Sequence, residues 1–233
     1  LIDDEGNWTV RKDVRNVSVM HKRGNMNVYR NDSMKVNNRK IGIEIGIGYE
    51  LGHYFKAPVM VLKSSIGNRS LGWDLLPPGS ERFEYTDPKD GKTYVYPAYQ
   101  DEVNHGRWEK GNVPERAGHK WYAGRQYDDD VRNAKQILSN IDEYYPGAKG
   151  YEVVGFFWWQ GDKDFRDAGH AERYEKNLVT MIEALRKDFD APKAKFVVAT
   201  LGQTTKDSSH TNQKKILDAK FAISDASKYP QLK

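Results

Sequence analysis

The sequence predicts an α/β fold, a three-layer α/β/α sandwich with a mostly parallel sheet. Two observations support this prediction. Short, nearly continuous apolar segments are typical of parallel strands that are buried on both faces, and longer segments with apolar residues at helical spacing alternate with them. The expected strands span about 59–62, 153–159 and 195–201. The expected helices span about 43–55, 130–145, 171–189 and 212–227.

The N-terminal part of the chain is the least regular. Residues 1–40 are polar and poorly periodic, and they suggest a hairpin with strands near 8–10 and 17–19. In the helix at 43–55, apolar residues recur every four positions, so they share one face, which we expect to be buried. The residues on that face are Ile43, Ile47, Leu51 and Phe55.

A long polar insert, from about residue 77 to 129, follows the first strand and its glycine-containing loop. Loops of this length are usually functional or disordered, and its many Tyr and Trp side chains argue against disorder. Flat rings with polar edges suit contacts with sugars. The alternative is that these rings form a small core of the insert. The helix that follows is expected to end at Pro146.

The strand at 153–159 ends abruptly in the polar residues 160–164. In parallel α/β sheets, ligands bind just beyond the carboxyl ends of the strands, so these residues predict a site. Trp158 and Trp159 must point to opposite faces of the strand, and we expect both to be packed. The helix at 171–189 is the clearest in the sequence, because its apolar residues are three and four positions apart.

Length and composition limit the possible functions. The 233 residues predict one domain, 1–233, with a sizeable core. The absence of cysteine excludes disulfides, thiol nucleophiles and zinc–thiolate sites. The net charge of +4 is spread along the chain and not gathered in one basic stripe, so nucleic acid is not an expected partner. A membrane partner is not expected either, because no long apolar run is present. The sequence does not indicate an oligomeric state.

Several segments together resemble one protein family. Residues 158–164, Trp-Trp-Gln-Gly-Asp-Lys-Asp, resemble the Trp-x-Gln-Gly block of the sialate O-acetylesterase-like carbohydrate esterases, a branch of the SGNH hydrolases. Residues 57–71 resemble that family's strand and glycine loop, and residues 41–52 resemble its helix entry. Residues 4–8 fit the segment after its nucleophile block, and the insert is the least matched part. The resemblance implies an SGNH, flavodoxin-like sandwich.

The same resemblance implies a serine-type hydrolase that removes acetyl groups from sugars, so an acetylated carbohydrate is the expected substrate. In that family the nucleophile lies in a Gly-Gln-Ser-Asn-Met block and the acid and base in an Asp-x-x-His block. The nucleophile block does not occur in this sequence, and no Asp-x-x-His block follows the last expected helix, at 212–227. We therefore expect the chain to be a central fragment, incomplete at both ends and inactive by itself, of an enzyme that is active at full length. Analogy favours a secreted or periplasmic location.

Gly67 and Gln160 are the candidate oxyanion-stabilising residues. Ester hydrolysis needs donors for the oxyanion as well as a nucleophile and a base. Gly67 has no side chain to obstruct its backbone N–H, and Gln160 ends a strand with an amide donor. The resemblance assigns both positions to the oxyanion hole. The alternatives are a turn glycine and a strand-end amide bonded to the backbone.

Residues beside these two are candidate substrate contacts: Asn68, Arg69 and Gly161. The planar guanidinium of Arg69 suits a carboxylate or an acetyl-sugar oxygen, and its alternative role is a surface ion pair. Ser64 stands near Gly67 but lacks a nucleophile motif, so we expect its hydroxyl to bond to the backbone.

Three further candidates lie farther along the chain. Asp164 could orient a sugar hydroxyl or the catalytic His, and the alternative is a helix N-cap. For Asp162 a structural role is expected, either a helix N-cap or a loop salt bridge. Trp108 and Trp121, in the insert, are the expected sugar-stacking residues. The histidines show no metal-binding spacing, and the resemblance implies no metal or organic cofactor.

Two other functions remain open. The chain could be a non-catalytic carbohydrate-binding protein that kept a degenerate SGNH fold, a reading that the missing blocks favour. An unrelated α/β nucleotide binder is the third hypothesis, and it is ranked last because no phosphate-binding glycine loop occurs in the sequence.

Overall fold

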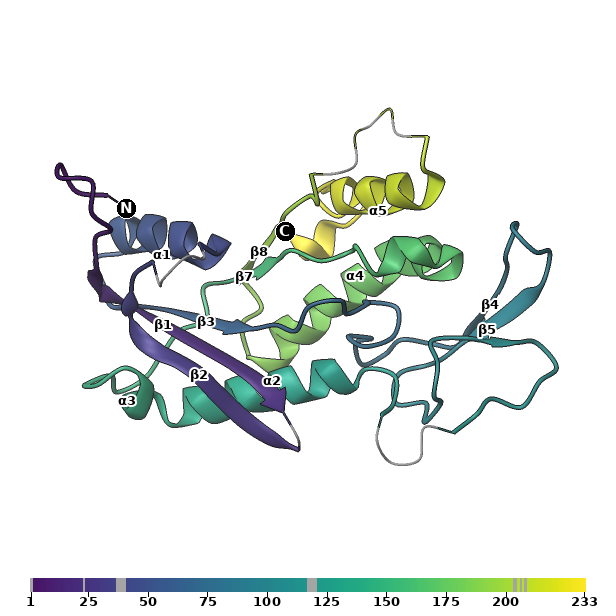
Figure 1. Cartoon of the computed structure of the whole chain (residues 1–233), viewed down its shortest axis with the longest axis horizontal. Helices are drawn as coiled ribbons and strands as arrows, with labels where there is room; N and C mark the ends of the chain where they lie inside the picture. Colours follow the sequence, from purple (N-terminus) through teal and green to yellow (C-terminus); the bar gives the residue numbers. More distant parts are fainter. Residues whose placement is uncertain are drawn as a thin grey trace. The chain divides into compact units, whose positions relative to one another are not determined.

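The computed structural model describes residues 2–22, 24–36, 41–116, 121–202, 205, 207 and 209–233. The chain divides into two compact units, the first made of Leu1–Ile66 and Asp129–Tyr151 and the second of Gly67–Asp128 and Glu152–Lys233. Both contain helices and strands, which confirms the α/β class (Figure 1). The predicted single domain, 1–233, stays a prediction.

The first unit is built on a three-stranded sheet of order β2-β1-β3. Its strands are β1 (Arg11–Lys22), β2 (Asn25–Met34) and β3 (Val59–Ser64). β1 is antiparallel to β2 and parallel to β3. The hairpin expected between residues 8–10 and 17–19 is wrong, because Val17 and Val19 pair with Asn31 and Val28 of β2. β2 is an edge strand whose residues alternate between exposed and half-buried, so its polar sequence concealed it.

Helices cover both faces of this sheet. Helix α1 (Ile43–Tyr54) packs on a cluster that contains Val14 and Val59. Helix α2 (Arg125–Ser139) contributes Ile137 to a second cluster with Val17 and Val19. Neighbouring residues of β3 divide between the two clusters, as strand geometry requires. The local order is therefore helix, sheet, helix.

The buried face of α1 agrees only in part with the predicted one, because Leu51 and Phe55 do pack against the Val14 cluster. The buried residues of the helix are Ile45, Gly48 and Tyr49, whereas Ile43 is 49 % exposed. A Cβ added to Gly48 would lie 2.5 Å from the Met34 side chain, so the missing side chain is what allows the close approach. An apolar-periodicity argument passes over such a contact because glycine contributes little hydrophobicity.

The predicted helix at 130–145 is two helices. α2 begins at Arg125, and its first turns bury polar residues such as Gln126, which is 2 % exposed. A separate short helix, α3 (Ile141–Tyr144), follows Asn140, whose φ of −116° and ψ of 41° are not helical. The start was missed because the buried face is polar there.

The second unit contains a parallel pair, β7 (Gly155–Trp158) and β8 (Lys195–Val198). The long helix α4 (Ala168–Asp188) packs beside α5 (Thr211–Ala222), as Figure 1 shows. Two 3₁₀ turns, η1 (Asp164–Arg166) and η2 (Pro230–Leu232), complete this part. The predicted apolar face of α4 is confirmed, with Tyr174, Leu178 and Met181 almost fully buried.

β7 is half-buried, and the expectation that both of its tryptophans are packed is wrong. Trp158 donates its Nε1–H to the Tyr174 hydroxyl, 3.3 Å away, and Phe156 lies against Phe189. Phe157 and Trp159, on the other face, are 47 % and 59 % exposed. The strand has only β8 beside it among the described residues, and α4 covers the Trp158 face.

The insert forms an antiparallel sheet of β4 (Phe83–Thr86), β5 (Thr93–Tyr96) and β6 (Trp108–Glu109). Phe83 stacks on the fully buried Tyr96 with ring centroids 4.7 Å apart, so some of its aromatics do form a local core. Parallel pairing within the described residues is limited to β1–β3 and β7–β8. The mostly parallel three-layer sandwich stays a prediction.

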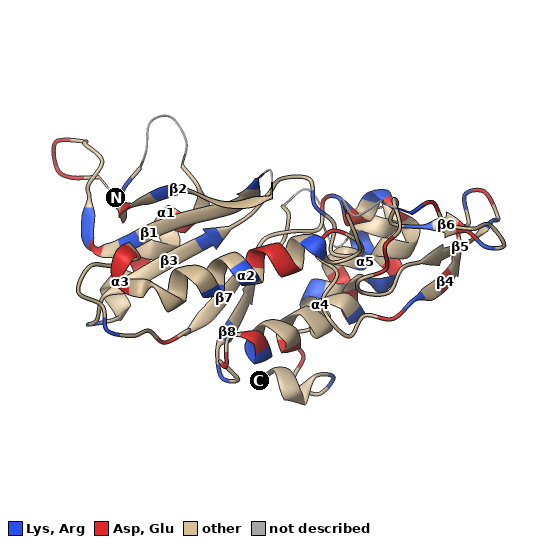
Figure 2. Cartoon of the chain, turned by 90° about the horizontal axis from the view of Figure 1, so that it is seen from below, with Lys and Arg blue, Asp and Glu red and all other residues tan. Residues whose placement is uncertain are grey.

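Charges of both signs are interspersed along the elements (Figure 2). None of the helices in the described ranges has the length and apolar character needed to cross a membrane.

Candidate functional site

Gln160 connects the end of β7 to the loop that begins at Gly67. Its Nε2 donates to the Arg69 carbonyl oxygen, 2.9 Å away, and to the Asp164 carboxylate. Its Oε1 accepts from the Tyr174 hydroxyl at 3.0 Å. The structure therefore brings together the two segments that sequence resemblance assigned to one site. Both amide hydrogens of Gln160 are used inside the protein.

Asp164 is fully buried and holds the same loop. Its carboxylate accepts from the backbone N–H groups of Leu71 at 2.9 Å and Gly72 at 2.8 Å. Burial raises the pKa of Asp164, while the nearby His170 and these hydrogen bonds act in the opposite direction. With the Gln160 amide, the carboxylate thus accepts three hydrogen bonds, and it joins the Leu71–Gly72 segment to the end of β7.

The suggested helix N-cap at Asp164 is wrong, because Asp167 has that role. The Asp167 carboxylate accepts from the N–H groups of Gly169 and His170 at the start of α4. Asp164 begins the preceding 3₁₀ turn, with its side chain turned to the loop. Asp162 forms the predicted exposed ion pair, with Arg166 at 2.6 Å.

Gly161 allows the chain to turn sharply after Gln160. Its φ of +135° is a conformation that side chains rarely adopt, and an added Cβ would lie 3.0 Å from Ile216 Cγ2. The glycine thus positions Gln160 and Asp164 through the backbone. A direct contact of Gly161 with substrate stays a prediction.

The loop residues Gly67 and Asn68 are exposed. A Cβ on Gly67 would meet no atom of the described residues within 4 Å, so the space beside its backbone is open on their side. Asn68 has a φ of +60°, in the left-handed region that asparagine tolerates better than most residues. The loop therefore presents its backbone, with little side-chain obstruction.

Arg69 is held inside the unit. Its Nη1 pairs with Asp74 at 2.8 Å, and its guanidinium carbon lies 4.7 Å from the ring centroid of Trp121. The Nε of Arg69 and the indole Nε1 of Trp121 are both buried without a hydrogen-bond partner among the described residues. Trp121 is thus next to the candidate site, because its ring contacts Arg69.

Trp108 is not brought to this cluster by any contact among the described residues. It lies on β6 opposite Val95, and Arg82 approaches its ring to 5.3 Å. Ser64 belongs to the first unit, where its hydroxyl donates to the Asp130 carboxylate and not to the backbone as expected. A side-chain acceptor on a helix far along the chain cannot be identified from local sequence.

Lys220 is a part of the site that sequence analysis missed. Its Nζ donates to the backbone carbonyls of Gln160 at 2.6 Å and Ala199 at 3.0 Å, which lie just beyond β7 and β8. Burial lowers the pKa of Lys220 to about 8, and the Asp164 charge opposes this shift. The available signal was its position four residues after Ile216, on the apolar face of α5.

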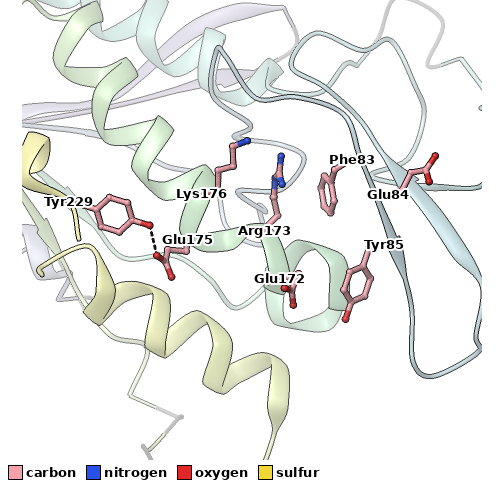
Figure 3. Close-up of a pocket in the computed structure, with 8 residues that line it drawn as sticks. All are labelled: Phe83, Glu84, Tyr85, Glu172, Arg173, Glu175, Lys176 and Tyr229. Carbon is pink, nitrogen blue, oxygen red and sulfur yellow. Dashed lines mark hydrogen bonds between the residues drawn. The ribbon is translucent and has the colours of Figure 1, made fainter. Parts of the chain in front are cut away.

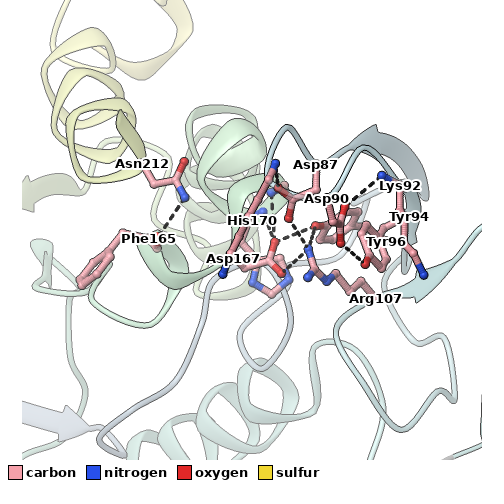
Figure 4. Close-up of polar contacts among 12 residues, drawn as sticks. Asp87, Asp90, Lys92, Tyr94, Tyr96, Arg107, Phe165, Asp167, His170 and Asn212 are labelled. Atoms are coloured by element: carbon pink, nitrogen blue, oxygen red, sulfur yellow. Dashed lines mark hydrogen bonds and ion pairs between the residues drawn. The ribbon is translucent and has the colours of Figure 1, made fainter. Parts of the chain in front are cut away.

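A second polar network holds the insert to the start of α4 (Figure 4). The Tyr96 hydroxyl donates to Asp167 at 2.7 Å, and Arg107 pairs with both Asp167 and Asp87, at 3.2 Å and 3.1 Å. Burial raises the pKa of the Tyr96 hydroxyl well above its usual value. This network supports the N-cap of α4 and thereby the turn that carries Asp164.

Within the described ranges, no group of three or more His, Asp or Glu side chains is arranged to hold a metal ion. The side-chain donors of the cluster, Gln160, Arg69 and Lys220, all bond within the protein. The exposed backbone at Gly67 and Asn68 is the part that a ligand oxygen can approach.

A protein-family model described as carbohydrate esterase, sialic acid-specific acetylesterase, matches residues 105–230. The match includes Gln160, Gly161 and Asp164, and it does not extend to the loop at Gly67. No curated protein and no solved structure matches the chain. Because the matched segment is more than half of the 233 residues, the chain belongs to this family of carbohydrate esterases, the sialic acid-specific acetylesterases.

Proposed function

We propose that residues Gly67–Gly72 and Gln160 form the oxyanion-binding side of a serine-type esterase that removes acetyl groups from sugars. One observation carries the proposal. Gln160 and Asp164 together bind the Arg69 carbonyl and the Leu71 and Gly72 amides, so this loop is fixed at the end of β7. A fixed set of backbone amides is what stabilises developing negative charge at little cost of reorganisation.

In the proposed reaction, a serine hydroxyl attacks the acetyl carbonyl and a histidine takes its proton. The oxyanion that forms accepts a hydrogen bond from the Gly67 N–H. The proton then passes to the sugar oxygen as the acetyl ester bond breaks, and water later releases acetate from the serine. The Gly-Gln-Ser-Asn-Met block does not occur in these 233 residues, and no Asp-x-x-His block follows α5. We therefore propose that the nucleophile and base come from outside this sequence.

Gln160 has two possible parts in this chemistry. Its N–H groups already bond to Arg69 and Asp164, so direct donation to the oxyanion requires the bond to the Arg69 carbonyl to be exchanged. Without that exchange, Gln160 acts by fixing the Gly67 loop.

The substrate contacts follow from the same geometry. Asn68 and Arg69 extend from the oxyanion loop, and Trp121 stacks on Arg69. We propose that these three, with Gly161 and Asp164 shaping the backbone below them, contact the acetylated sugar. Trp108 remains a prediction for a more distant part of the glycan.

Two assays test the proposal. The 233-residue chain should not hydrolyse p-nitrophenyl acetate above background, and a serine-dependent rate from it would contradict the assignment of the nucleophile. In the protein encoded by the complete open reading frame, Gln160→Ala should lower kcat about 10²–10³-fold, the usual effect of losing an oxyanion donor. The matched control is Asp162→Asn, which removes the charge of a half-exposed carboxylate that pairs with Arg166 at the surface.

A non-catalytic carbohydrate-binding protein is the second candidate function. The observation that favours it is the full use of both Gln160 amide hydrogens inside the protein. If the product of the complete open reading frame binds glycans but shows no ester hydrolysis, this second function replaces the first.

A further inference from the structure

A pocket of about 510 Å³ lies on the second unit, between the β4 strand and α4. Its lining residues are Phe83, Glu84, Tyr85, Glu172, Arg173, Glu175, Lys176 and Tyr229 (Figure 3). The volume is within the range of small-molecule sites. None of these residues belongs to the Gln160 cluster, although Tyr174, the neighbour of Arg173 on α4, bonds to Gln160. Helix α4 thus contributes residues both to the pocket and to the Gln160 cluster.

The charges in the pocket are largely neutralised from outside it. Glu172 pairs with Lys215, Glu175 pairs with Lys228, and Glu84 pairs with Lys110. The Tyr229 hydroxyl donates to Glu175, as Figure 3 shows. The pocket is therefore not strongly acidic, despite its three glutamates.

Arg173 is the exception. Among the described residues it forms no ion pair, and its guanidinium carbon lies 4.8 Å from the ring centroid of Phe83. A guanidinium presents its N–H groups in a planar fork that suits oxygen acceptors. In Figure 3 the guanidinium lies between α4 and Phe83, within the pocket.

Aromatic rings border the same space. Phe83 and Tyr85 are two residues apart on β4, so they share one face of the insert sheet. Tyr85 has Lys215 Nζ 5.8 Å from its ring centroid, and Tyr229 lies across the pocket from it. Half-buried rings beside an unpaired, planar set of donors are the groups that recognise a sugar ring and its oxygens.

We propose that this pocket is a glycan-binding subsite, separate from the Gly67 loop, for a sugar unit that is not the one deacetylated. Tyr85 and Tyr229 contact the ring, and Arg173 donates to its hydroxyl or carboxylate oxygens. The proposal rests on the proposed function for its substrate class. It makes the protein's preferred substrate an acetylated sugar within an oligosaccharide and not a free monosaccharide.

The test is binding of lactose, as a neutral probe, and 3′-sialyllactose, as an acidic one, to the 233-residue chain by ligand-observed NMR titration. We expect at least one to bind, and we expect Arg173→Ala and Tyr85→Ala each to weaken binding about tenfold. Binding of both probes assigns the Arg173 contact to hydroxyls, and binding of sialyllactose alone assigns it to the carboxylate. Failure of both probes to bind overturns the proposal.

Two controls separate the pocket from general damage. Lys187→Ala removes an exposed cation near the end of the same helix and should leave binding unchanged. Arg173→Lys keeps the charge and should retain part of the affinity. Equal binding by every variant would overturn the subsite. If Gln160→Ala leaves hydrolysis by the complete protein unchanged while Arg173→Ala still weakens binding, the proposed function fails and the subsite stands.

Discussion

Asp164 is the residue on which the geometry of the candidate site most depends. It is fully buried, and its two oxygens receive the Leu71 and Gly72 amides and the Gln160 amide. Asp164→Asn keeps the size but replaces one acceptor oxygen with a donor, so at least one of these N–H groups loses its partner. We expect the free energy of unfolding to fall by about 1–3 kcal/mol, the cost of an unsatisfied buried group.

Urea denaturation measures this change, and Asp162→Asn is the matched control two residues away. The Asp162 side chain is 49 % exposed and pairs with Arg166 at the surface, and surface pairs of this kind contribute little. Equal destabilisation by both substitutions would show that Asp164 has no special role in holding the loop.

Lys220 predicts a pH dependence of stability. Burial lowers its pKa in the folded protein to about 8, from a usual value of 10.5. Between these two values the unfolded chain binds more protons than the folded chain, so stability rises with pH across that window. Lys220→Met removes this titration, and its free energy of unfolding should show a smaller rise between pH 8 and pH 10.5. Parallel pH profiles for the two proteins would contradict the buried position of Lys220.

At the scale of elements, α1 offers two glycines with opposite expectations. Within the part of the chain that the structure describes, a Cβ at Gly46 would meet no atom within 4 Å, whereas one at Gly48 would lie 2.5 Å from Met34 Cε and 3.2 Å from Val14 Cγ1. Gly46→Ala should therefore stabilise the protein by about 0.5–1 kcal/mol through helix propensity. Gly48→Ala should destabilise it by about 1–3 kcal/mol because it overpacks the contact with the sheet.

Thermal unfolding of the two variants checks this pair. Stabilisation by both substitutions would mean that α1 does not pack closely on β1 and β2.

The elements that sequence patterns predicted well are those with strong apolar periodicity. Helix α4 and strands β3 and β8 lie where expected, because large apolar residues recur in them at helical spacing or in short runs. The pattern failed where contacts use other residues. Gly48 of α1 lies against Met34 and Val14 of the sheet, Gln126 is buried in the first turns of α2, and β2 is a polar edge strand. None of these residues adds to the apolar periodicity from which a helix or strand is predicted.

At the scale of the whole molecule, the proximity of the Gly67 loop and Gln160 was predictable only through family resemblance. The pair is held by the Gln160 bond to the Arg69 carbonyl, between positions 91 residues apart. Local sequence carries no information on such a contact. The roles of Lys220 and Tyr174 were not predicted, because an isolated Lys or Tyr on a helix is common and only the fold places both beside Gln160.

Buried tyrosines give the last prediction, for the stability of the whole chain in alkali. Burial raises the pKa of Tyr96, Tyr127 and Tyr174 well above the usual value of 10.0. Above about pH 10 the unfolded chain loses these protons while the folded chain keeps them. The stability that these groups provide is present below that pH and is lost as pH rises, so the free energy of unfolding should fall steeply between about pH 10 and pH 12.

Urea unfolding across that range, compared with Tyr127→Phe, tests the cause. Tyr127 donates to Asp188 at 2.6 Å, and its side chain is almost fully buried. Removing this single phenol should reduce the slope of stability against pH by about 1.4 kcal/mol per pH unit, the equivalent of one proton. Burial beside a carboxylate should keep the Tyr127 hydroxyl protonated in the folded chain. An unchanged slope would contradict this, because it would mean that the hydroxyl ionises as readily in the folded chain as in the unfolded one.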